Sequence, residues 1–98
     1  MGSTTGETTL YVISYDISDD RRRTKVHAIL SGFGTWTQYS LFECYLSSKE
    51  LILLRSRLAR VLHPDDHVRL YVLCHACQGR VEVFGRKEKP QEPHVFIV

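Results

Sequence analysis

The first half of the chain shows one strand pattern followed by one helix pattern. Residues 10–15 are rich in β-branched and aromatic side chains, which predicts a buried strand. Ser18, Asp19 and Asp20 are residue types that favour the start of a helix. Beyond them, apolar residues recur at the spacing of one helical face until glycines at positions 32 and 34. The pattern predicts an amphipathic helix of about four turns, with Val26, Ile29, Leu30 and Phe33 on its apolar face.

The second half repeats this alternation of strand and helix patterns. Residues 35–46 are almost all strand-forming types, enough for two short strands or one bent strand. A second helix begins at Ser48 and ends before Pro64. Residues 67–74 predict another strand, residues 80–85 alternate like a fifth, and residues 94–98 suit a short sixth. The apolar face of the second helix consists of Leu51, Leu54, Leu58, Val61 and Leu62.

The order strand, helix, strand, strand, helix, strand is the pattern of the ferredoxin-like βαββαβ sandwich, an α+β fold with both helices on one face of an antiparallel sheet. We expect one domain over residues 1–98, with a loose N-terminus over residues 1–8. The strands predicted within residues 80–98 exceed this pattern. They either extend the same sheet or add to the sheet of a second copy, which predicts a homodimer with strand exchange.

The composition is that of a globular domain, with 43% hydrophobic and 24% charged residues among 98. The net charge of +2 is too small to indicate a nucleic-acid-binding protein by itself, but the cations are clustered. Such clusters predict contacts with phosphates, although solvated helix faces explain them about equally well. The two clusters are Arg21, Arg22, Arg23 and Lys25, and Arg55, Arg57 and Arg60.

Asp16 ends the first predicted strand, where the chain leaves for a helix. By the alternation of the strand, it lies on the same side as Leu10, Val12 and Ser14. Mg²⁺ usually takes one or two carboxylates and completes its shell with water and phosphate, so one Asp16 from each of two copies would suffice. The alternative is structural, with Asp16, Asp19 and Asp20 as turn and N-cap residues.

The three cysteines are predicted to be thiols. The polar start of the sequence lacks the pattern of a secretory signal, and no apolar run approaches the ~20 residues of a membrane span. We therefore expect a cytoplasmic protein with no membrane partner and with reduced cysteines. Cys74, His75 and Cys77 form a CHAC segment without a second CxxC, which favours small residues at a strand end over a metal or redox site. The third cysteine is Cys44.

The segment "YVISYDISDDRRRTKV", followed by "GTWTQYSLFEC", resembles the CRISPR-associated protein 2 family. The pattern YDIxDxxRRxKV, a Gly and QYSxFEC together cover residues 15–44, and the later elements fit in order and length. The resemblance implies a ferredoxin-like homodimer whose C-terminal strands reach the partner's sheet. One departure is that Trp36 and Thr37 precede Gln38, where many relatives have a basic residue. The missing cation weakens the case for efficient nuclease activity.

The resemblance also implies the function and the site. Family members are described as endonucleases dependent on Mg²⁺ (or Mn²⁺) that cleave RNA or double-stranded DNA. They also form the dimer that bridges two dimers of the CRISPR integrase, CRISPR-associated protein 1, during spacer acquisition. The non-catalytic alternative is therefore a DNA-binding scaffold, and a small-molecule regulatory domain is a third hypothesis. The implied catalytic residues are Asp16, which is also the metal ligand, Tyr15, Arg23, Ser40 and Phe42, with Lys25 as a further basic position.

Overall fold

The computed structural model describes residues 7–85, which form four strands and three helices. The elements follow in the order β1 (Thr9–Asp16), α1 (Asp20–Ser31), β2 (Thr35–Gln38), β3 (Leu41–Leu46), α2 (Ser48–Val61), β4 (His67–Leu73) and α3 (His75–Gln78). The ferredoxin-like α+β prediction is confirmed, and of its two alternatives for residues 35–46 the one with two short strands is correct. No helix in the described part of the chain is long and apolar enough to span a membrane.

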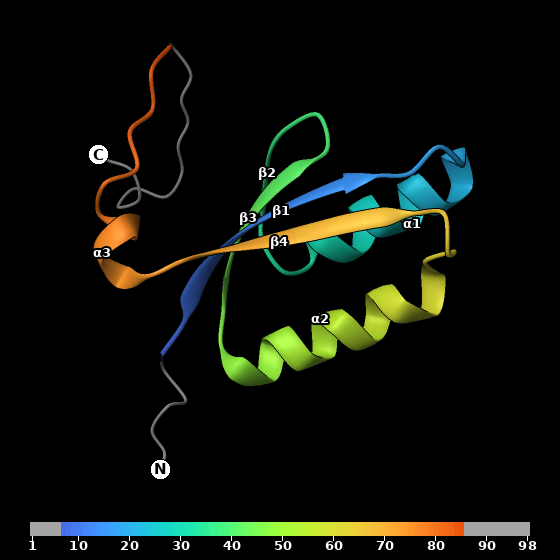
Figure 1. Ribbon diagram of the computed structural model, residues 1–98, viewed down its shortest axis with the longest axis horizontal. Helices are drawn as coiled ribbons and strands as arrows, with labels where there is room; N and C mark the ends of the chain where they lie inside the picture. Colours follow the sequence, from blue (N-terminus) through green and yellow to red (C-terminus); the bar gives the residue numbers. More distant parts are fainter. Residues whose placement is uncertain (1–6, 86–98) are drawn as a thin grey trace.

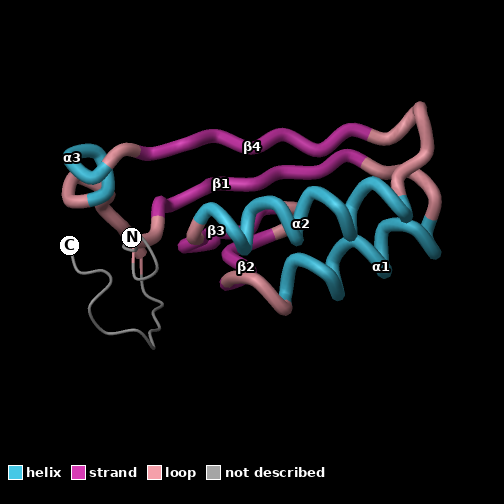
Figure 2. The backbone as a smooth tube through the Cα atoms, turned by 90° about the horizontal axis from the view of Figure 1, so that it is seen from below, coloured by secondary structure: helices cyan, strands magenta, loops and turns pink. Residues whose placement is uncertain are grey.

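The sheet is antiparallel, with strand order β2-β3-β1-β4. Strand β1 is one of its two interior strands and pairs with β3 along one edge and with β4 along the other. Helices α1 and α2 run side by side against one face of the sheet, whereas α3 lies at the end of β4 that is remote from them (Figures 1 and 2). We call the face under α1 and α2 the covered face.

The core lies between the covered face and the two long helices. Ile13 and Phe42 from the sheet, Val26 and Leu30 from α1, and Leu54 from α2 are all fully buried. These α1 and α2 positions are among those predicted from the helical spacing. Burial of such aliphatic and aromatic side chains is the main term that stabilises the fold.

Local sequence explains where each long helix begins. The side chain of Asp19 accepts a hydrogen bond from the backbone N–H of Arg22 at the start of α1. Ser47 and Glu50 form a reciprocal capping box at the start of α2. Both arrangements satisfy backbone donors that a helix start leaves unpaired. The role of Asp19 thus agrees with the N-cap hypothesis for that residue.

Gly34 is required by a close approach between two segments of backbone. A Cβ atom at this position would collide with Cys44 and with the carbonyl oxygen of Glu43 on β3. Gly32, by contrast, has ordinary contact distances around it. The glycine at position 34 therefore does more than end α1, since it lets the chain enter β2 beside β3.

The opposite face of the sheet has no long helix against it among the described residues, and we call it the open face. Its members follow from the strand register, in which residues opposite one another share a face. Val12 lies between Glu43 and Tyr71, while Ser14 lies beside Arg69. Tyr71 and Tyr45 are 51% and 47% exposed there. The open face therefore displays aromatic and charged groups together.

The C-terminal part of the described chain differs from the prediction. Residues 75–78 form the short helix α3, which the sequence pattern did not predict, and residues 81–85 form no strand. Among the described residues, none of the four strands pairs with residues 81–85, so their backbone groups lie outside the sheet. Val83 and Phe84 are 69% and 86% exposed. The strand expected over residues 94–98 lies outside the described residues.

Candidate nucleic-acid and metal site

Asp16 is the last residue of β1 and lies on the open face. Its strand neighbour is His67, and its side chain is exposed. Ser14 and Val12 precede it on the same face, as the alternation of the strand predicted. Within residues 7–85, no side chain donates a hydrogen bond to the Asp16 carboxylate. The carboxylate is therefore available to a cation or to a partner molecule.

Asp16 places a single exposed carboxylate at the end of β1. No group of three or more His, Cys, Asp or Glu side chains in the described residues could hold a metal ion. Asp16 is nevertheless a hard anionic oxygen donor, the ligand type that Mg²⁺ and Mn²⁺ prefer, and among residues 7–85 it forms no ion pair. Asp16 therefore fits such an ion as one ligand, and Asp16 of a second copy would supply another.

A cleft of about 460 Å³ lies on the other side of β1 from Asp16. It brings together three of the predicted catalytic residues, Tyr15, Arg23 and Ser40. Because consecutive strand residues point to opposite faces, Tyr15 and Asp16 cannot share this cleft. The predicted catalytic set is thus divided between two faces of the sheet. The other residues that line the cleft are Thr24, His27 and Tyr39.

Tyr15 and His27 are in hydrogen-bond contact inside this cleft. The Tyr15 hydroxyl lies 3.1 Å from Nδ1 of His27. Burial raises the pKa of Tyr15 above its usual 10, while the charge of Arg23 opposes this rise. Tyr15 is therefore a neutral phenol at physiological pH and can act as a donor. When it donates to Nδ1, the imidazole proton resides on Nε2.

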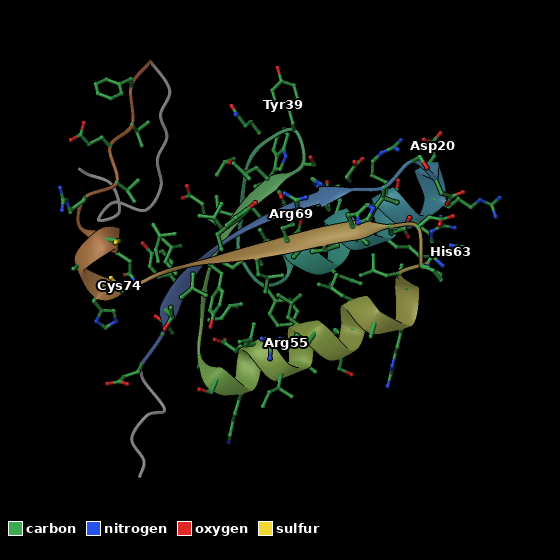
Figure 3. All side chains as sticks on the ribbon, viewed as in Figure 1. Asp20, Tyr39, Arg55, His63, Arg69 and Cys74 are labelled. Carbon is green, nitrogen blue, oxygen red and sulfur yellow. The ribbon has the colours of Figure 1, made fainter. Side chains whose placement is uncertain are left out.

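Tyr39 sits at the tip of the β2–β3 hairpin, beside the same cleft. Its φ of 45° is in the left-handed region, which is uncommon for a residue other than glycine. The indole N–H of Trp36 donates to the Tyr39 carbonyl at 2.7 Å and holds the turn. The ring is 85% exposed and projects from the tip (Figure 3). An exposed ring in a held backbone conformation suits stacking on an unpaired base.

Arg23 braces the loop that follows Asp16. Its Nη1 donates to the carbonyl oxygens of Ile17 at 2.9 Å and Ser18 at 3.3 Å, and its Nη2 pairs with Asp20. Three donors of the guanidinium are thereby directed at the β1–α1 loop. Arg23 is a positioning residue for the end of β1 as well as a cation at the edge of the cleft.

Phe42 belongs to the core. It is 0% exposed, and its ring contacts His27 at 5.0 Å between centroids and Tyr15 at 6.4 Å. A side chain without exposed surface cannot touch a nucleic acid. The contribution of Phe42 to the site is to support the two side chains that contact one another in the cleft.

Arg22 is committed to a structural ion pair. Its Nε and Nη2 donate to the two carboxylate oxygens of Asp66 at 2.8 and 3.3 Å, and the Asp66 side chain is only 2% exposed. The hydrogen bond from Arg22, followed by one from the backbone N–H of His63, holds the pKa of Asp66 below its usual value. The pair links the start of α1 to the α2–β4 loop, so Arg22 is a weak candidate for binding phosphate.

The remaining basic residues are better placed for nucleic acid. Arg21 and Lys25 on α1 and Arg60 on α2 are exposed, and in the described chain none of them pairs with an acid. Arg57 lies over the ring of Phe33, 5.6 Å from its centroid. Arg55 lies closer to the start of α2 (Figure 3), beside a second depression near the start of β1.

Sequence reasoning missed His27 and did not assign Tyr39 to a site. His27 follows Arg23 by four residues on α1, so the two lie on neighbouring turns of the same helix face. That spacing is a signal that sequence analysis can use. The left-handed conformation of Tyr39 has no such signal, because neither glycine nor asparagine marks the position.

The fold is that of a ferredoxin-like α+β domain, and the exposed carboxylate of Asp16 lies at one end of its open face. The family model described as CRISPR associated protein Cas2 matches residues 9–81. The match spans well over half of the chain. The chain therefore belongs to the CRISPR-associated protein Cas2 family.

Individual relatives agree with this assignment. The chain is 40% identical over 90 residues to CRISPR-associated endoribonuclease Cas2 3 of Synechocystis sp., covering 91% of this chain and 98% of the relative. It is 41% identical over 90 residues to CRISPR-associated endonuclease Cas2 2 of Thermus thermophilus, covering 91% and 96%.

Solved structures show the same fold. A hypothetical protein TT1823 from Thermus thermophilus is similar with a TM-score of 0.73 and 40% identity, over 86% of this chain and 99% of that one. A crystal structure of cas2 is similar with a TM-score of 0.70 and 30% identity, over 94% of this chain and 100% of that one.

Proposed function

We propose that the protein is a homodimeric endonuclease of CRISPR spacer acquisition that cleaves phosphodiester bonds of RNA or DNA in the cytoplasm with Mg²⁺ or Mn²⁺. The observation that carries the proposal is the exposed Asp16 carboxylate at one end of the open face. The relatives named endoribonuclease and endonuclease support the reaction class.

The open face supports the dimer. Tyr45 and Tyr71 expose much of their rings there, and aromatic side chains are favoured at protein interfaces. Two copies that meet through their open faces also bring both Asp16 residues to one interface, since the residue ends the strand on that face. Mg²⁺ usually takes one or two carboxylates from protein and completes its shell with water and phosphate, so two Asp16 side chains would suffice.

The metal, when bound, supplies activation of water and neutralisation of charge on the phosphate. The two Asp16 side chains would hold it. Arg23 keeps the loop after Asp16 in place through Ile17 and Ser18. In the cleft, the neutral Tyr15 hydroxyl, His27 and Ser40 offer hydrogen bonds to the sugar–phosphate backbone, with Tyr39 beside them for stacking.

The direct test is Asp16→Asn, which keeps the side-chain shape and removes the anion. We expect loss of Mg²⁺-dependent cleavage of both single-stranded RNA and duplex DNA, with an unchanged sedimentation coefficient. Asp65→Asn is the matched control, because it also removes one carboxylate, and the Asp65 side chain is 90% exposed and pairs with His63 rather than belonging to the proposed site. Cleavage by Asp16→Asn at the rate of the control would refute the proposed site.

A second function is favoured by the exposed cations. Arg21, Lys25 and Arg60 have no acid partner within residues 7–85, a distribution that suits contacts with duplex phosphates. On this account the dimer is a scaffold that holds DNA and bridges two dimers of the CRISPR integrase, CRISPR-associated protein 1.

The scaffold function is tested by binding without cleavage. We expect Asp16→Asn to bind duplex DNA with the affinity of the unaltered protein and to form the complex with the integrase in light scattering. A folded Asp16→Asn dimer that binds neither duplex DNA nor the integrase would contradict the scaffold function. It would show that both interactions require the Asp16 carboxylate.

A further inference from the structure

The CHAC segment forms a defined structure that the proposed nuclease does not use. Cys74 is the N-cap residue of α3, and Cys77 lies within the same turn. The backbone N–H of Gln78 donates to the Cys74 carbonyl at 2.9 Å, which closes the helical turn between the two cysteines. Both thiols are exposed, at the end of β4 remote from the β1–α1 loop (Figure 3).

This turn suits a disulfide. Cα atoms three residues apart in a helical turn are about 5 Å from one another, which is within the range that a disulfide bridges. The remaining cysteine is unsuited to exchange, since Cys44 is buried in the core and burial raises its pKa to about 11. The chain thus contains one accessible cysteine pair and one inert cysteine.

The two thiols of the pair also differ from each other. The backbone N–H of Cys77, and then its thiol, stabilise the Cys74 thiolate and lower the pKa of Cys74. The hydrogen bond to Cys74 correspondingly raises the pKa of Cys77. An attacking thiol with a lowered pKa beside a protonated neighbour is the arrangement that thiol–disulfide exchange requires.

We propose that Cys74 and Cys77 form a redox-active pair that is reversibly oxidised to an intrachain disulfide by low-molecular-weight disulfides. The Cys74 thiolate attacks one sulfur of the small disulfide, which forms a mixed disulfide and releases one thiolate. Cys77 then loses its proton, attacks the Cys74 sulfur and displaces the second thiolate. The protein loses two electrons and two protons, and the small disulfide becomes two thiols.

The position of the pair gives the oxidation a structural consequence. Residues 79–85 leave the domain directly after α3, and the Arg80 N–H donates to the Cys77 carbonyl at 3.0 Å. His75 anchors the same turn to the start of the chain through the Thr8 carbonyl, 3.4 Å from its Nε2. A disulfide across the turn would fix the point from which residues 79–85 depart.

The test is a redox titration of the full-length protein in glutathione buffers, with free thiols trapped by alkylation and located by peptide mass spectrometry. We expect Cys74 and Cys77 to be lost together in one two-electron transition while Cys44 stays reduced. In Cys77→Ser, glutathione should remain attached to Cys74. In Cys74→Ser, Cys77 should react about tenfold more slowly than Cys74 does in the unaltered protein.

Three results would overturn the proposal. Cys74 and Cys77 titrating independently would show that they do not form a pair. Disulfides that form only between chains would show that Cys74 is not oxidised with Cys77 of its own chain. Protection of both thiols by stoichiometric Zn²⁺ at submicromolar concentration, reversed by a chelator, would show that the pair is a metal ligand instead.

Discussion

The two faces of the sheet are built from the same strands but carry different chemistry. The covered face holds Ile13 and Phe42, which are 0% exposed against α1 and α2. The open face of the same strands holds Asp16, Glu43 and Tyr71, which combine charge with exposed aromatic surface. Because side chains alternate along a strand, one sequence can specify a core on one side and a binding surface on the other. The difference indicates which substitutions affect folding and which affect function.

The largest expected effect comes from opening a cavity on the covered face. Phe42→Ala should lower the free energy of unfolding by about 3–5 kcal/mol, because a buried aromatic ring is removed. Tyr71→Ala on the open face should lower the protomer's stability by much less, since half of its surface already contacts water. Urea unfolding of both variants measures the difference. Equal losses would mean that the two faces are energetically alike.

Next in size is the effect of a charge on the open face. Tyr71→Glu should weaken dimerisation by at least about tenfold, because the partner's sheet would have to desolvate a new carboxylate. The matched variant is Ile52→Glu on α2, which is 65% exposed outside this face. Sedimentation equilibrium should show a shift for Tyr71→Glu alone. A dimer that tolerates Tyr71→Glu would place the interface elsewhere.

The exposed and the paired cations should respond differently to substitution. Arg55→Ala with Arg60→Ala should reduce the slope of log affinity against log salt for duplex DNA by about one unit per lost phosphate contact. Arg22→Ala should instead lower the unfolding midpoint and leave the slope unchanged, because Arg22 is paired with Asp66. Filter binding across a salt series distinguishes the two effects. An unchanged slope after loss of Arg55 and Arg60 would show that these residues do not contact DNA.

The smallest expected effect concerns pH and Glu43. Burial raises the pKa of Glu43 in the folded chain, so its contribution to stability is present below the unfolded value near ~4.3 and is lost as the pH rises through the folded value. Glu43→Gln should therefore raise the unfolding midpoint slightly at pH 7, with no gain at pH 3.5. Thermal melts at the two pH values check this. An equal rise in the unfolding midpoint at both pH values would show that the effect comes from packing and not from the charge of Glu43.

Much of the covered face could be predicted from the sequence, because its elements carry strong periodic signals. Val26, Leu30, Leu54 and Leu58 were all placed on apolar helix faces by their spacing, and all four are buried. The placement of Asp16 on a side with Val12 and Ser14 likewise followed from alternation and agrees with the strand register.

The site was harder to predict, because it depends on contacts between distant residues. The sequence predicted Arg22 as a phosphate ligand because it lies in a cluster of cations. In the fold, Asp66 of the α2–β4 loop pairs with it instead. Phe42 occupies the position that the family resemblance assigned to catalysis, yet the fold buries it. The turn at Cys74 depends on a hydrogen bond from the backbone N–H of Gln78 to the Cys74 carbonyl, which no local sequence pattern marks. The strand expected over residues 80–85 is not part of the sheet in residues 7–85, because an alternating pattern does not determine whether the segment pairs with a neighbouring strand.

The central claim is that two Asp16 residues, one from each copy, form one site. Dimers assembled from mixtures of unaltered and Asp16→Asn chains, purified with two different affinity tags, test this directly by their rate of Mg²⁺-dependent cleavage. If the site is shared, dimers with a single Asp16 should be as inactive as dimers with none. Activity in the mixed dimer at half the rate of the unaltered dimer would show that each copy carries its own site and would contradict the account.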